Sequence, residues 1–98
     1  MIYHVTHSKD WEFAQAKGFY EASSLAKEGF IHASSESQVQ GVLDRFYPSE
    51  KGLLLLHIEE SLLNVPLKYE LAPSLNENFP HIYGPLNLEA VVAISNIL

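Results

Sequence analysis

Leu53-Leu54-Leu55-Leu56-His57-Ile58 is a nearly continuous apolar run with the length of one strand. Runs of this kind are typical of a central strand that is covered on both faces. We therefore predict that this segment lies in the middle of a sheet. Its uninterrupted part, Leu53–Leu56, is far shorter than the ~20 apolar residues that a membrane-spanning helix needs.

Other segments have the alternation or the composition of strands: Ile2–Thr6, Phe30–Ser34, Leu67–Ala72 and Leu88–Ile97. Phe19-Tyr20 is expected to form a short extended piece. Pro73–Leu86 contains three of the five prolines, and we expect it to be an irregular, partly rigid loop.

A first main helix is predicted between Ser8 as its N-cap and Gly18 as its C-cap. We expect its buried side to consist of Trp11, Phe13 and Ala14. One or two helical turns are expected over Ser23–Glu28, where Gly29 would end them.

The second main helix is predicted after Ser35 and Gln38, which have the spacing of a capping box. Its apolar residues recur at the helical spacing i, i+3, i+4 and i+7: Val39, Val42, Leu43 and Phe46. Pro48 would end it. Strands combined with two main helices indicate an α+β fold with a mixed sheet. The length of 98 residues predicts a single domain over residues 1–98.

The composition restricts the class of protein. Hydrophobic residues make up 47% and charged residues 18% of the chain, which is typical of a globular protein. The chain has no cysteine, which excludes disulfides, thiolate metal sites and a cysteine nucleophile. The net charge is −6 and the six basic residues are scattered, which argues against binding to nucleic acid or to a membrane surface. With no signal-peptide pattern at the N-terminus, we expect a cytoplasmic protein.

The histidines carry the functional signal. Ile2–Ser8 and Phe30–Glu36 resemble each other: each has a strand histidine, a hydroxyl residue two positions later, and a helix start. Residues two apart on a strand share a face, so His4 lies with Thr6 and the same spacing joins His32 to Ser34. If the two strands are neighbours, they form a pocket that favours a small anion or a nucleotide, because helix N-termini adjoin it.

A structural explanation competes with this one. Strand histidines often bond only to the backbone, and a following Ser or Thr is often only a helix cap. We interpret His7 and His57 as structural residues for this reason. Three histidines would suit a catalytic zinc ion, but no closely spaced pair of metal ligands occurs, so we expect no metal.

His81 lies in the segment Asn78–Pro85, where two prolines and a glycine restrict the backbone. Rigid loops with polar and aromatic groups are common at binding sites. We predict that His81 and Tyr83 close the cleft, with His81 as an acid or base because imidazole titrates near neutrality. The alternative is a surface turn with Tyr83 packed inward.

Four blocks together resemble a small bacterial family, the domain-of-unknown-function family numbered 952. These blocks are Ile2–Thr6, Glu28–Ser34, Arg45–Tyr47 and Phe79–Leu86, and the resemblance covers nearly the whole chain. The family has no established activity, so this resemblance implies no reaction.

His4-Val5-Thr6 and His32-Ala33-Ser34 are also similar to the first two motifs of the ADP-ribosyltransferase superfamily, which includes the NAD-using RNA 2′-phosphotransferases. That resemblance implies split, small antiparallel sheets around an NAD cleft. It also implies that His4 contacts the ribose next to nicotinamide, and that His32 lies against the nicotinamide. Thr6, Ser34 and Tyr83 would complete the cofactor site, with His32 and His81 as the catalytic pair.

The chain departs from the superfamily in two respects. The third motif has a glutamate that stabilises a cation-like transition state; Glu70 and Glu89 are the candidates here, but neither has the motif around it. RNA phosphotransferases hold phosphate with arginines, whereas this chain has only Arg45. We therefore do not expect transfer of an RNA 2′-phosphate.

Three hypotheses follow from the sequence. The first is an NAD- or nucleotide-binding domain with an ADP-ribosyltransferase-like activity. The second is a non-catalytic module that binds a small anion or a peptide in the same cleft. The third is a structural protein in which Phe79–Leu86 packs against another chain, and the sequence does not predict an oligomeric state.

Overall fold

Antiparallel sheets and short helices make up residues 1–97, which are the residues that the computed structural model describes. The strands are β1 Ile2–His7, β2 Phe19–Tyr20, β3 Ile31–His32, β4 Leu53–Ile58, β5 Leu67–Ala72, β6 Glu77–Ile82, β7 Leu86–Asn87 and β8 Val91–Ile97. The helices are α1 Ser8–Lys17, α2 Ser23–Glu28 and α3 Val39–Phe46, with 3₁₀ turns at Glu36–Gln38, Glu60–Leu62 and Leu88–Ala90. The expected α+β class is confirmed. None of these helices is long and apolar enough to cross a membrane.

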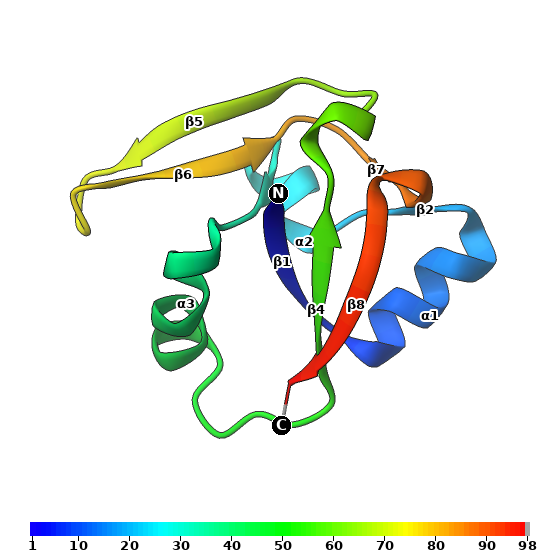
Figure 1. The fold of residues 1–98 in the computed structure, drawn as a ribbon, viewed down its shortest axis with the longest axis horizontal. Helices are drawn as coiled ribbons and strands as arrows, with labels where there is room; N and C mark the ends of the chain where they lie inside the picture. Colours follow the sequence, from blue (N-terminus) through cyan, green and yellow to red (C-terminus); the bar gives the residue numbers. More distant parts are fainter. Residues whose placement is uncertain (98) are drawn as a thin grey trace.

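The apolar run Leu53–Ile58 is β4, the middle strand of the sheet β1-β4-β8, as predicted. Figure 1 shows α1 and α3 on opposite sides of these three strands. The expectation of a mixed sheet is wrong, because every strand pair in the described chain is antiparallel. β1 and β8 point the same way but are separated by β4, and a short turn joins β5 to β6.

A second sheet has the order β3-β6-β5 and contains the segment expected to be a loop. Pro73–Leu86 includes β6, although Pro80 lacks the N–H that a ladder normally uses. Pro80 directs its carbonyl toward the end of β3, where it accepts a hydrogen bond from the Ala33 N–H at 3.0 Å. The missing donor therefore falls beyond the paired part of β3, and the pairing with β5 is uninterrupted.

The two larger sheets meet at one bridge and then diverge. The N–H of Tyr3 donates to the Ser34 carbonyl, and the N–H of Ser34 donates to the Tyr3 carbonyl, both at 2.8 Å. The segment Phe30–Ser34 passes from β6 to β1 at this point, which is why β3 is shorter than predicted. Beyond the bridge, β1 has an open edge.

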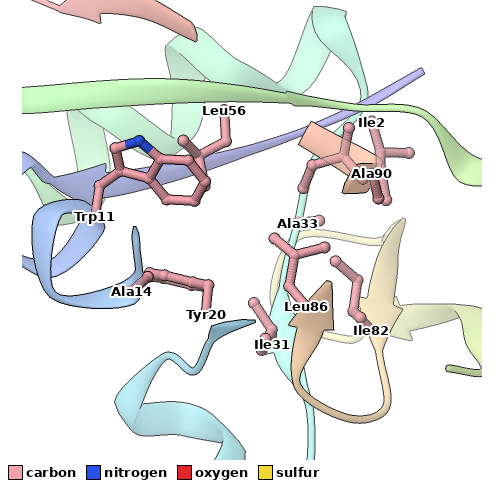
Figure 2. Close-up of a cluster of buried hydrophobic side chains, with 11 residues drawn as sticks. Ile2, Trp11, Ala14, Tyr20, Ile31, Ala33, Leu56, Ile82, Leu86 and Ala90 are labelled. Atoms are coloured by element: carbon pink, nitrogen blue, oxygen red, sulfur yellow. The ribbon is translucent and has the colours of Figure 1, made fainter. Parts of the chain in front are cut away.

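The core lies between the central sheet, α1 and the short β2–β7 sheet. Its buried members are Ile2, Trp11, Ala14, Tyr20, Ile31, Ala33, Leu56, Ile58, Ile82, Leu86 and Ala90. Figure 2 shows Trp11 reaching from α1 toward Leu56 of β4. Phe13, expected in the core, is exposed, because its position on α1 points away from the face formed by Trp11 and Ala14.

The helix termini were predicted in part. Gly18 and Gly29 adopt left-handed conformations after α1 and α2, as expected. Ser8 is not the N-cap of α1: His7 occupies that position, and no side chain caps it. The capping box of Ser35 and Gln38 is confirmed, at the 3₁₀ turn before α3.

The apolar residues that recur at helical spacing along α3 do not enter the core. No residue of α3 is buried, and Phe46 is 63% exposed. The two predicted main helices are α1 and α3, and α2 is the expected pair of helical turns over Ser23–Glu28. In Figure 1, α3 stands apart from the central sheet. Its Val42 and Phe46 border a cleft instead.

Candidate functional site

A cleft of about 960 Å³ lies where the two sheets diverge, bordered by β1, α3 and the β5–β6 hairpin. This volume is typical of sites for small molecules and cofactors. Five residues that the sequence singled out lie on its wall: His4, Thr6, His32, Ser34 and His81. Tyr83, also expected there, does not line it.

His4 is buried at the floor, with both ring nitrogens engaged. Nδ1 is 2.5 Å from the His32 carbonyl, and Nε2 is 2.8 Å from the Tyr20 hydroxyl. Burial lowers the pKa of His4 to about 4, so the ring is neutral at physiological pH. A carbonyl only accepts, so Nδ1 carries the proton and Nε2 is an acceptor.

Tyr20 completes this floor. Burial raises the pKa of Tyr20 to about 12, so its hydroxyl keeps its proton. The hydroxyl oxygen lies 2.9 Å from Thr6 Oγ1 as well as near His4. Since neutral His4 offers a bare Nε2, Tyr20 donates to it and Thr6 donates to the Tyr20 oxygen. The sequence pairing of His4 with Thr6 is confirmed as a shared face, but the tyrosine that links them had no sequence signal beyond its extended position.

The main chain of Val5 forms an open edge beside this floor. Main-chain N–H and C=O groups of alternate residues on a strand point to the same side. The N–H and C=O of Val5 therefore point the same way as those of Tyr3, away from β4. Ser34 pairs only with Tyr3. Val5 lines the cleft, and within residues 1–97 the strand pairing on this side of β1 stops at the bridge of Tyr3 and Ser34, so the Val5 main chain has no ladder partner there. One donor and one acceptor side by side are complementary to a planar amide.

His32 occupies the rim rather than the floor. Its side chain is 54% exposed, and Nε2 lies 2.8 Å from a carboxylate oxygen of Glu28. Its backbone carbonyl, not its ring, meets His4. The cleft therefore brings His4 and His32 to one hollow, but their rings serve different parts of it. Ser34 is buried beneath the rim.

His81 lies directly opposite His32, because the two residues are paired between β6 and β3. Their ring centroids are 5.4 Å apart, and Phe30 stacks on His81 at 4.0 Å. Nδ1 of His81 donates to a Glu70 carboxylate oxygen at 2.8 Å, and no partner of Nε2 occurs among residues 1–97. The hydroxyl of Tyr83 donates to the same Glu70 oxygen, which places Tyr83 behind the cleft wall.

Part of the cleft wall is apolar and includes Val42, Phe46, Leu75 and Phe79. Within the described chain, the wall carries the carboxylates of Asp10 and Glu21 but no lysine or arginine. The expected preference for anions therefore has no cationic side chain behind it.

The two histidines that were interpreted as structural differ in position. His7 lines the cleft and lies 2.9 Å from a Glu50 oxygen. His57 lies off the cleft wall and contacts Ser95 Oγ at 2.7 Å. In residues 1–97, no three His, Asp or Glu side chains are grouped as metal ligands.

Comparison with known proteins identifies the family. The family model described as "Protein of unknown function (DUF952)" matches residues 5–94. This chain belongs to the DUF952 family. DUF952 membership confirms the resemblance seen in the four sequence blocks, and it brings no activity with it.

Solved structures of one protein, CC0527, are similar to this chain. The X-ray structure of protein CC0527 from Caulobacter crescentus has 30% sequence identity and a TM-score of 0.88, covering 97% of this chain and 83% of that one. Its solution NMR structure has 30% identity and a TM-score of 0.84, with 98% and 83% covered. No curated protein matches the chain. The relatives thus support the arrangement of strands and helices and leave the function to be argued from the site.

Proposed function

We propose that the cleft binds a nicotinamide nucleotide such as NAD, in an ADP-ribosyltransferase-like manner. The observation that carries this proposal is the open main-chain edge of Val5 next to the buried pair His4 and Thr6. A primary carboxamide presents one acceptor and one donor in a plane, and Val5 presents the matching donor and acceptor. A flat aromatic ring carrying that group would lie between the two sheets.

The ribose would lie against the polar floor. Thr6 uses its proton on Tyr20, so its oxygen retains lone pairs that can accept from a ribose hydroxyl. Ser34, buried close to the bridge, offers a second hydroxyl. His32 and His81 would flank the ring from the rim, with Phe30 packed against both of them.

The phosphates would point toward the open mouth of the cleft. The wall has no lysine or arginine among the described residues, so recognition depends on the nicotinamide and ribose end. This feature disfavours polyphosphate or RNA as the main determinant of affinity. The divergence of the sheets at the bridge of Tyr3 and Ser34 supports the split-sheet fold that the superfamily resemblance implies.

Isothermal titration and NMR with NAD test the proposal. We expect binding that shifts the amide resonances of Val5 and Thr6, and a loss of affinity of about fivefold in Thr6→Val, since one hydrogen bond is worth roughly 1 kcal/mol. His57→Gln serves as the matched control, because His57 lies outside the cleft wall. The absence of shifts at Val5 at millimolar NAD would contradict the proposal.

A further inference from the structure

Glu70 does not line the cleft and reaches it only through an imidazole. It shares a face of the β5–β6 pair with His81, whose Nδ1 donates to Oε1 at 2.8 Å. Tyr83 donates to that same oxygen, and Lys68 Nζ lies 4.9 Å from the Tyr83 ring centroid. The hydrogen-bonded series Tyr83–Glu70–His81 therefore runs along one face of the second sheet and ends at the cleft wall.

The geometry determines the tautomer of His81. Hydrogen bonds from Tyr83 and His81 lower the pKa of Glu70, so its carboxylate is ionised and can only accept. Nδ1 must then carry the proton, and a neutral ring has its lone pair on Nε2. His81 is on the cleft wall, with Phe30 stacked on one face to restrict rotation of the ring. A bare nitrogen, oriented by a carboxylate, is the arrangement that general bases use.

We propose that His81 Nε2 is the general base of this cleft, acting on water or an acceptor hydroxyl, and that Glu70 and Tyr83 are its positioning residues. The inference rests on the proposed binding of NAD. In the superfamily that this chain resembles, a glutamate contacts the ribose. Here the His81 imidazole, positioned by Glu70, would take that place. Glu89, the other acidic candidate, accepts a hydrogen bond from Asn87 at 3.3 Å and lies off the cleft wall.

The step balances with water as the acceptor. The C1′–N bond between ribose and nicotinamide breaks, and its electron pair goes to the ring nitrogen, which leaves as neutral nicotinamide. The water oxygen bonds to C1′, and its proton passes to His81 Nε2. The resulting imidazolium remains next to the Glu70 carboxylate, which stabilises it. With an alcohol in place of water, the same step gives the O-linked ADP-ribosyl glycoside of that alcohol.

Two measurements test this assignment. The first is nicotinamide release from NAD by the full chain and by its variants. We expect His81→Gln to lose about 10²–10⁴-fold in turnover, far more than it loses in affinity for NAD, because the ring of His81 also flanks the ligand. Glu70→Gln should lose turnover with an unchanged KM, and Glu89→Gln is the matched control expected to behave as the wild type.

The second measurement is the tautomer of the His81 ring, read from its ¹⁵N shifts at a pH where the ring is neutral. We expect the Nδ1–H form in the wild type and a mixture of forms in Glu70→Gln, which needs no ligand. An Nε2–H ring in the wild type, or full turnover in His81→Gln, overturns the assignment. Binding of NAD without nicotinamide release by the wild type also overturns it, while the proposed function stands. No binding at all overturns both.

Discussion

The imidazole of His4 and the hydroxyl of Tyr20 face each other at 2.8 Å across the boundary between the central sheet and β2. Both side chains are buried, and the ring planes meet at 62°. The Tyr20 hydroxyl is the hydrogen-bond donor to Nε2 of His4, whose other ring nitrogen bonds to the His32 carbonyl. The cleft floor is thus held by a polar contact inside the core.

Removing that hydroxyl should therefore weaken the fold. In Tyr20→Phe, Nε2 of His4 loses its donor in a buried position, and we expect unfolding to become easier by about 1–3 kcal/mol. Urea denaturation measures this. Tyr69→Phe is the control, because the Tyr69 hydroxyl bonds to Glu60 at an exposed position and should change the stability much less. Equal effects of the two substitutions would contradict the role of the buried contact.

Burial of neutral His4 predicts a pH dependence of stability. The folded pKa is about 4 and the ordinary value is 6.5, so between these two the unfolded chain binds one more proton. Stability from this group is complete above pH 6.5 and falls with pH toward 4, by about 3 kcal/mol. Urea denaturation at a series of pH values across that range measures this effect. The free energy of unfolding should depend less steeply on pH in His4→Gln than in the wild type. An identical slope in this variant would mean that His4 is charged in the fold.

The strands could be predicted where a local pattern of apolar residues in the sequence marks them. Alternation in Ile2–Thr6 and the apolar run of β4 were sufficient to locate the central sheet. Pro80 led to the wrong prediction of a loop where β6 forms. A proline disrupts a sheet only if its missing N–H faces a paired strand, and here that depends on where β3, distant in the sequence, stops pairing. Position on α1 likewise exposes Phe13, whose hydrophobicity alone predicted burial.

The candidate site shows the same division. His4, Thr6, His32 and Ser34 could be paired from their spacing, since a period of two fixes which residues share a face of a strand. The contacts of Tyr20 with His4 and of Glu70 with His81 could not be predicted from spacing, because the tertiary fold brings these residues together. The open edge of Val5 leaves no trace in the sequence, because it follows from where Ser34 stops pairing.

The Glu70 carboxylate should titrate at a higher pH once Tyr83 is changed. Hydrogen bonds from Tyr83, first, and from His81 lower the pKa of Glu70 in the fold. Glu70 therefore stabilises the fold above its ordinary pKa, and this contribution is lost as pH falls through the lowered value. In Tyr83→Phe, a ¹³C NMR titration should show the Glu70 pKa moving up. Tyr69→Phe should leave it unmoved, and an unchanged value in Tyr83→Phe would contradict the contact.

The central strand should dominate the stability of the sheet. Leu56 is fully buried in the core cluster, so Leu56→Ala is expected to destabilise the fold by about 2–5 kcal/mol. Leu71 of β5 is 55% exposed, and Leu71→Ala should change stability by less than about 1 kcal/mol. Thermal unfolding of the two variants compares them directly. A mild effect at Leu56 would argue against the described core.

The central claim is that the open edge of Val5 recognises a carboxamide, and titration of ¹⁵N-labelled protein with nicotinamide and with nicotinate tests it most directly. The two ligands have the same shape, but the carboxylate has no N–H to donate to the Val5 carbonyl and repels it. We predict saturable shifts of the Val5 amide with nicotinamide and none with nicotinate at the same concentration. Equal shifts with both ligands, or shifts confined to residues outside the cleft, would contradict the proposal.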